Sequence, residues 1–318
     1  MWETKITQML GIQYPIIQGA FGGFGTSELA APVSDAGGLG IITGNALGTP
    51  EALREDIRKA KSMTAKPIGV NLTAVGFWNI EGMCEVAIEE GITVVETAGF
   101  RADQYGKILK EAGVVWIHKV ATMKHALAAE RQGVDAVVVV GLEGAGFKSI
   151  IQLPTMIAIP WAARQLKVPL IAAGGIADAR GFMAALAMGS EAVYMGTAFM
   201  ATKECPIPDS YKQILVEGDP TEPKFRERNL APPEAKEYAK VMSERGNVPE
   251  GEWLIKLERV LLKESAELPT EANFMEEVMR LAPGSLAVSV IDGVPTVKEF
   301  IDGLISEAED IRRRWALG

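Results

Sequence analysis

Eight short runs rich in apolar and β-branched residues recur between Pro15 and Met195, and longer stretches of helical periodicity separate them. This alternation predicts strand and helix units that build a parallel sheet. The expected strands are 15–18, 39–43, 67–72, 93–96, 114–119, 136–140, 169–173 and 192–195. The expected crossover helices include 50–62, 123–132, 154–166 and 179–188.

Eight such strands fit a closed barrel better than an open sheet, because every strand of a barrel with an outer helix layer is buried on both faces. The chain contains neither a GxGxxG string nor a GxxxxGK[ST] string, so the nucleotide-binding modes those strings carry are disfavoured. The sequence therefore predicts an α/β fold, a (β/α)8 TIM barrel.

The character of the chain changes after Thr202. Six prolines punctuate the charged stretch 206–233, and helical patterns follow over 234–244, 253–262 and 271–281. An amphipathic segment over 295–314 then has the length and pattern of the last barrel helix. We expect a cofactor-binding barrel over 1–204, a helical insertion or lid over 205–285, and a C-terminal return to the barrel over 286–318.

Composition limits the partners of this chain. Its 318 residues are 48% hydrophobic, and 32 basic against 41 acidic residues give a net charge of −9. Such a surface repels nucleic acid and anionic lipid, so neither is an expected partner. Only Cys84 and Cys205 are present, without a Cys/His cluster, so no disulfide framework and no metal site is expected. Without a leader or a long apolar run, we expect a cytoplasmic protein.

Glycines mark the exits of two neighbouring strands. Ala172 and Ala173 precede Gly174 and Gly175, and after one helix Met195 precedes Gly196 and Thr197. Glycine lets backbone N–H groups approach a phosphate, and the last strand exits of a barrel commonly bind one. A tight turn also needs glycine for its own geometry, yet two adjacent turns with a threonine in reach favour a phosphate site.

These motifs together resemble the nitronate monooxygenase family, formerly called 2-nitropropane dioxygenases. The likeness is carried by the strings 118–127, 143–146, 172–176 and 195–202, and it extends from Pro15 to about Pro206 and again over 287–309. That family also includes FMN-dependent NAD(P)H:quinone reductases and FMN-dependent enoyl-ACP reductases.

The resemblance implies FMN held at the C-terminal mouth of the barrel. Its phosphate would lie on the glycine turns named above. Gln18, Gly19 and Ala20 would run beside the isoalloxazine, and Asn71 would bind its pyrimidine edge. Lys119 would stabilise negative charge on the reduced ring. The expected cofactor-binding residues are Gln18, Gly19, Ala20, Asn71, Lys119, Gly146, Ala173, Gly174, Gly175, Gly196 and Thr197.

One position departs from the family pattern. Where nitronate monooxygenases carry a histidine base after the glycine turn of the sixth strand, this chain has Phe147. A phenyl ring accepts no proton, whereas a nitronate is already deprotonated. We therefore expect oxidation of alkyl nitronates with O2 and weak activity on neutral nitroalkanes.

The expected catalytic residues are Lys119, His118, Phe147 and Glu143. Neighbours on a strand point to opposite faces, so if Lys119 faces the barrel mouth, His118 packs under a helix. Glu143 could tune protonation or be a solvated turn residue. His125, at a helix start, has the pattern of a surface residue.

Other functions stay open. Hydride transfer from NAD(P)H to a quinone or enoyl acceptor is one alternative, and a cofactor-free isomerase or lyase acting on a phosphorylated substrate is another. A noncatalytic binder of a flavin or of a phosphate ligand is a third. Each predicts a small-molecule ligand, and assembly into a homo-oligomer also stays open.

Overall fold

The computed structural model describes residues 2–20, 25–74, 79–99, 103–146, 149–230, 235–248, 253, 256–257, 260 and 284–316. Its single sheet has eight strands, and all eight coincide with predicted strands to within three residues at either end. They are β1 Ile16–Gln18, β2 Gly40–Thr43, β3 Ile68–Ala74, β4 Val94–Gly99, β5 Val115–Val120, β6 Ala136–Val140, β7 Leu170–Ala173 and β8 Ala192–Met195.

The strands close into a barrel. Their order is β1-β8-β7-β6-β5-β4-β3-β2, and every adjacent pair is parallel. The remaining seam between β1 and β2 is joined by a bridge from Ile17 to Leu39. The predicted TIM barrel is thus confirmed.

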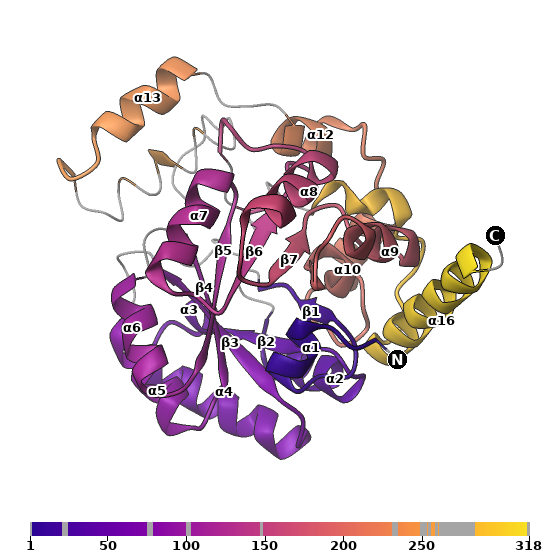
Figure 1. The fold of residues 1–318 in the computed structure, drawn as a ribbon, viewed down its shortest axis with the longest axis horizontal. Coiled ribbons are helices and arrows are strands. Elements are labelled where there is room, and N and C mark those ends of the chain that lie inside the picture. The colour runs from indigo at the N-terminus through magenta and orange to yellow at the C-terminus, as the bar shows by residue number, and fades with distance from the viewer. Residues whose placement is uncertain are drawn as a thin grey trace.

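Helices surround the barrel (Figure 1). The last helix, α16, packs against both α9 and α2, so it completes the ring between them. The ring consists of α2 Ser27–Asp35, α4 Pro50–Met63, α5 Ile80–Glu89, α6 Asp103–Glu111, α7 Met123–Gln132, α8 Thr155–Gln165, α9 Ala179–Ala187 and α16 Val297–Ala316. Shorter elements are α1 Lys5–Leu10, α3 Gly44–Leu47, α10 Thr197–Met200 and the 3-10 turn η1 Leu286–Val290.

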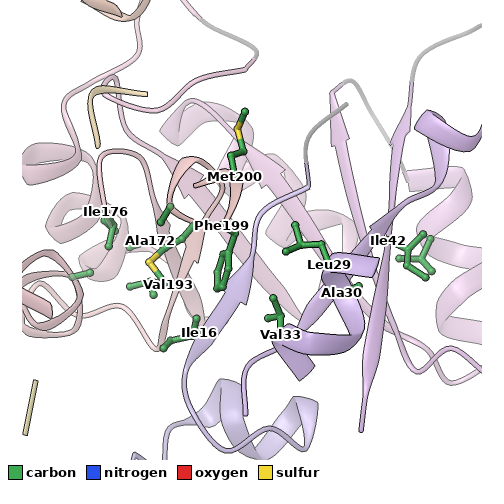
Figure 2. Packing of buried hydrophobic residues seen from close by; sticks show 14 of the residues in the cluster. Ile16, Leu29, Ala30, Val33, Ile42, Ala172, Ile176, Val193, Phe199 and Met200 are labelled. Carbon is green, nitrogen blue, oxygen red and sulfur yellow. The ribbon is translucent and has the colours of Figure 1, made fainter. Parts of the chain in front are cut away.

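The core has two layers because successive strand residues point to opposite faces. In the outer layer, Ile16 and Val193 of the strands face Leu29 and Val33 of α2 and Phe199 of α10 (Figure 2). The inner layer fills the lumen with a separate cluster that includes residues such as Ile17, Ile41, Val94, Ile117 and Tyr194.

Helix α1 closes one end of the lumen. Its Ile6 and Leu10 belong to the inner cluster. Thr4, which caps α1, donates its hydroxyl to the Glu191 carbonyl at 2.7 Å, immediately before β8 begins. Apolar side chains therefore fill the amino-terminal end of the barrel, and barrels of this kind usually bind ligands at the opposite end.

The chain between α10 and η1 makes the helical excursion. It contains α11 Asp209–Val216, α12 Pro223–Leu230 and α13 Ala235–Ser243, and α13 stands apart from the barrel in Figure 1. The helix expected over 271–281 lies outside the described residues, and the three-part division stays a prediction. No helix in the described ranges combines the length and apolar character needed to cross a membrane.

Candidate functional site

Four polar side chains meet inside the barrel, toward the carboxyl ends of the strands. They are Asn71 of β3, Glu96 of β4, Lys119 of β5 and Tyr194 of β8, here called the lumen array. Asn71 and Glu96 pair in the register of β3 and β4, and Glu96 pairs with Ile117, two residues before Lys119. Strand register therefore places these four groups together.

The hydroxyl of Tyr194 is the centre of the lumen array. It accepts hydrogen bonds from the Ala20 amide at 2.7 Å and from Lys119 Nζ at 3.2 Å. It donates to Glu96 Oε2 at 3.1 Å. One donor and two acceptor positions are all that a phenol offers, so this hydroxyl is fully used. It joins the exit of β1 to the side chains of β4 and β5.

Glu96 is the buried carboxylate of the array, with 1% of its surface exposed. Its Oε2 also accepts from Asn71 Nδ2. Its Oε1 lies 3.6 Å from Lys119 Nζ and has no hydrogen-bond partner. Burial raises the pKa of Glu96, while Lys119, Asn71 and Tyr194 act against that rise.

Burial also raises the pKa of Tyr194 well above its ordinary value, and the negative charge of Glu96 adds to the rise. The phenol therefore stays neutral. Lys119 lies over the Tyr194 ring, 4.9 Å from its centroid, and 19% of its side chain is exposed. It is the one ionic group of the array that reaches toward the barrel mouth.

His118 lies on the opposite side of β5. Its Nδ1 is 2.7 Å from Thr97 Oγ1, which also accepts from Trp116 Nε1 at 2.7 Å. Burial lowers the pKa of His118 to about 4, so the imidazole is neutral. The structure brings Lys119 into the lumen array and leaves His118 outside it, while His125 lies in the first turn of α7. Neither histidine of the chain faces the lumen.

The turn after β7 exposes backbone donors. Gly174 and Gly175 have φ values of 103° and 73°, a left-handed conformation that side chains disfavour. A Cβ on Gly174 would also lie 2.9 Å from the Gly141 backbone. Within the described part of the chain, neither amide donates a hydrogen bond. The backbone conformation and the packing at this turn therefore both require glycine. The two amide N–H groups remain without an acceptor among the described residues.

Glu143 acts as a helix cap. Its Oε2 accepts from the backbone N–H of Thr155 at 2.8 Å and lies 2.7 Å from the Thr155 hydroxyl. A carboxylate at the first residue of α8 suits the positive end of the helix. The same hydroxyl lies 2.9 Å from the Gly174 carbonyl, so Glu143 and Thr155 brace the β7 turn. Gly146 follows with φ 94°, and Phe147 lies outside the described residues.

The exit of β8 is tied to the returning chain. Thr197 donates its hydroxyl to Ser285 Oγ at 2.9 Å and accepts from the Ser285 amide at 3.0 Å. The Leu286 amide donates to the Glu143 carbonyl at 3.0 Å. The segment at 285–286 therefore bridges two strand exits, and the Thr197 hydroxyl that the sequence suggested for a phosphate is already bonded.

Gln18 and Gly19 form part of the barrel wall. Gln18 is fully buried, its Oε1 accepts from the Ile41 amide at 2.9 Å, and its Nε2 donates to the Gly19 carbonyl at 2.9 Å. The Gln18 side chain therefore supplies the acceptor for the Ile41 amide at the seam where β1 and β2 share only an isolated bridge. Gly19 approaches Gly196 so closely that a Cβ would lie 3.0 Å from the Gly196 amide. Ala173, 3% exposed, packs in the inner cluster.

Glu96 and Tyr194 were not among the residues predicted from the sequence. Glu96 is a charged residue in a strand that begins with two valines, and this is a signal because a buried charge needs a partner. Tyr194 gave no comparable signal, since an aromatic residue in a strand is ordinary.

Comparisons with known proteins identify the family of this chain. The profile of the nitronate monooxygenase family matches residues 3–307. Among curated proteins, the (3aS,4S,5R,7aS)-5-hydroxy-7a-methyl-1-oxo-octahydro-1H-indene-4-carboxyl-CoA dehydrogenase of Rhodococcus jostii is 37% identical over 66% of this chain. The chain spans 58% of that relative's length. A probable nitronate monooxygenase of Staphylococcus haemolyticus is 31% identical over 70% of this chain and 74% of its own.

Solved structures share the fold over nearly the whole chain. FabK from Thermotoga maritima has a TM-score of 0.79 and 32% identity, covering 99% of this chain and 98% of its own. A nitroalkane oxidase from Streptomyces ansochromogenes has a TM-score of 0.74 at 20% identity, over 97% of this chain and 99% of its own, which supports the fold alone. The chain belongs to the nitronate monooxygenase family, a family of flavin-dependent oxidoreductases.

Proposed function

We propose that this protein binds FMN at the carboxyl-terminal mouth of its barrel and oxidises alkyl nitronates with O2. Bound FMN would supply the electron acceptor, taking electrons from the substrate and passing them to O2. The observation that carries the substrate choice is the placement of both histidines away from the lumen, because a substrate that is already an anion needs no base.

The residues present fit such a cofactor. The unpaired amides of Gly174 and Gly175 suit a phosphate group, and the backbone of Gly196 and Thr197 would complete its site. Gly19, Ala20 and Asn71 would border the ring system, with Gly146 and Ala173 at neighbouring strand exits. Phe147 occupies the position of the family's histidine base, and the proposal includes it on the sequence alone as the residue that replaces that base.

The side chains of the array would act by charge and position. Lys119 presents a cation at the mouth, where it attracts an anionic substrate. Tyr194 fixes both that ammonium group and the Ala20 amide through its hydroxyl. Glu96 lies 3.6 Å from the Lys119 ammonium, so an ionised Glu96 would offset the charge of that cation.

A second function is favoured by the relatives. The 37% identical protein is named a dehydrogenase of a carboxyl-CoA compound, which makes a CoA thioester a second candidate substrate class. In that case NAD(P)H or a related hydride donor would exchange electrons with the flavin, and a quinone or enoyl compound is a further candidate acceptor.

Anaerobic stopped-flow mixing separates these functions. We expect 2-nitropropane nitronate to bleach the flavin, and neutral 2-nitropropane to bleach it far more slowly. Equal rates for the two forms would contradict the claim that the protein lacks a base able to deprotonate a neutral nitroalkane. Bleaching by NADH or NADPH but not by nitronate would favour the second function, and a colourless purified protein would favour a cofactor-free isomerase or lyase.

A further inference from the structure

The lumen array contains one ion pair that is poorly compensated. The groups that face Glu96 are Asn71 from β3, Lys119 from β5 and Tyr194 from β8. Of these, Lys119 alone carries a positive charge. Its Nζ stands 3.6 Å from Glu96 Oε1, which exceeds ordinary hydrogen-bond length. An ionised Glu96 therefore depends for its charge compensation on an ammonium group that does not hydrogen-bond to it.

The two members of this pair differ in their access to the mouth. Glu96 is 1% exposed, whereas 19% of the Lys119 side chain is exposed. A new negative charge above the array would attract Lys119 and would also repel Glu96 directly. Both effects favour the neutral carboxylic acid, because an opposite charge nearby stabilises an ionised carboxylate and a like charge destabilises it.

We propose that Glu96 takes up a proton when the cofactor bound at the mouth is reduced, and releases that proton on reoxidation. The inference rests on the proposed function, since it needs a redox cofactor above Lys119. The substrate that is oxidised, or dithionite in the test below, would supply two electrons, and bound FMN would take up those electrons with one proton and keep one negative charge. Glu96 takes a second proton from water and changes from carboxylate to carboxylic acid.

The geometry supplies a place for that proton. Oε2 accepts from Asn71 Nδ2 and from the Tyr194 hydroxyl, whereas Oε1 is buried and carries no hydrogen bond. Protonation at Oε1 leaves both Oε2 bonds intact. The raised pKa of Glu96, caused first by burial, lowers the free energy needed to protonate it.

Proton counting tests this role. The FMN-loaded protein is reduced anaerobically with dithionite in weak buffer containing a pH indicator, at several values between about pH 6 and pH 8. We expect the unmodified protein to take up more protons per flavin than Glu96→Gln, with the difference approaching one. Equal counts would overturn the proposal. Glu130→Gln is the matched control, because Glu130 caps the Lys167 amide on the exposed surface, and its count should equal that of the unmodified protein.

A second measurement needs no variant. The infrared difference between reduced and oxidised protein, with and without ¹³C-labelled glutamate, should show a protonated carboxyl band that grows on reduction and shifts with the label. Absence of that band in the unmodified protein overturns the proposal even if Glu96→Gln fails to fold. A protein that binds no flavin overturns the proposed function as well, whereas a flavoprotein without the band overturns the role of Glu96 alone.

Discussion

Acid should destabilise this barrel through His118. The imidazole is buried against Thr97 and Trp116, and its pKa falls from 6.5 to about 4 in the folded protein. A group with a lowered pKa contributes stability that is present above its unfolded pKa and is lost as the pH falls toward its folded pKa. At about 1.36 kcal/mol per unit, the shift corresponds to about 3 kcal/mol, lost between about pH 6.5 and pH 4.

Burial makes protonation costly because the charged imidazole loses its hydration, and the positive charges of His125 and Lys119 add to the cost. Thr97 Oγ1 already accepts from Trp116 Nε1, and its single proton can be donated to His118 Nδ1. A protonated imidazole would bring a second donor to that oxygen, and the hydroxyl proton would lose its short acceptor.

Urea unfolding of the unmodified protein and of His118→Gln, followed by circular dichroism across this pH range, measures the effect. The variant loses packing at every pH, so the readout is the difference between the two unfolding free energies. We expect that difference to shrink by about 3 kcal/mol from about pH 7 to pH 4. His125→Gln should change the pH dependence in the same direction but less, because burial and Lys124 also lower the pKa of His125 while its side chain stays exposed. Parallel curves for His118→Gln would refute the reasoning.

Three further predictions concern the site and the barrel wall. Gly175→Ala and Gly133→Ala both place a side chain at positive φ, at a cost of roughly 1 kcal/mol each, and the Cβ at 175 would also lie 3.1 Å from Glu143 Cβ. Only Gly175→Ala should weaken FMN binding in a fluorescence titration. Tyr194→Phe removes a hydroxyl with three partners and should lower the unfolding free energy by about 1–3 kcal/mol; an unchanged melting temperature would contradict this. Gln18→Leu leaves the Ile41 amide without its acceptor, so hydrogen exchange at Ile41 should accelerate.

The barrel could be predicted because each strand is a short run of apolar residues that can be recognised from its own sequence. Runs such as Ala136–Val140 are apolar throughout, and the structure gives that strand the same bounds. Helix α1 was not anticipated. Its six residues carry little periodicity, and its position depends on Glu191, which is far away in the sequence.

The site was predictable only in part. Strand alternation placed Lys119 and His118 on opposite faces from sequence alone. Glu96 and Tyr194 meet across 98 residues, and Thr197 meets Ser285 across 88. Such pairings depend on how strands register and on where the returning chain lies, and neither leaves a local trace.

The apolar seal that α1 forms beneath the lumen has a kinetic consequence. Because Ile6 and Leu10 pack into the amino-terminal end of the lumen, we expect reactants to enter and leave by the carboxyl-terminal mouth. If two reactants bind the same site at that mouth, the first must leave as product before the second binds. Their double-reciprocal rate plots should then be parallel lines rather than intersecting ones.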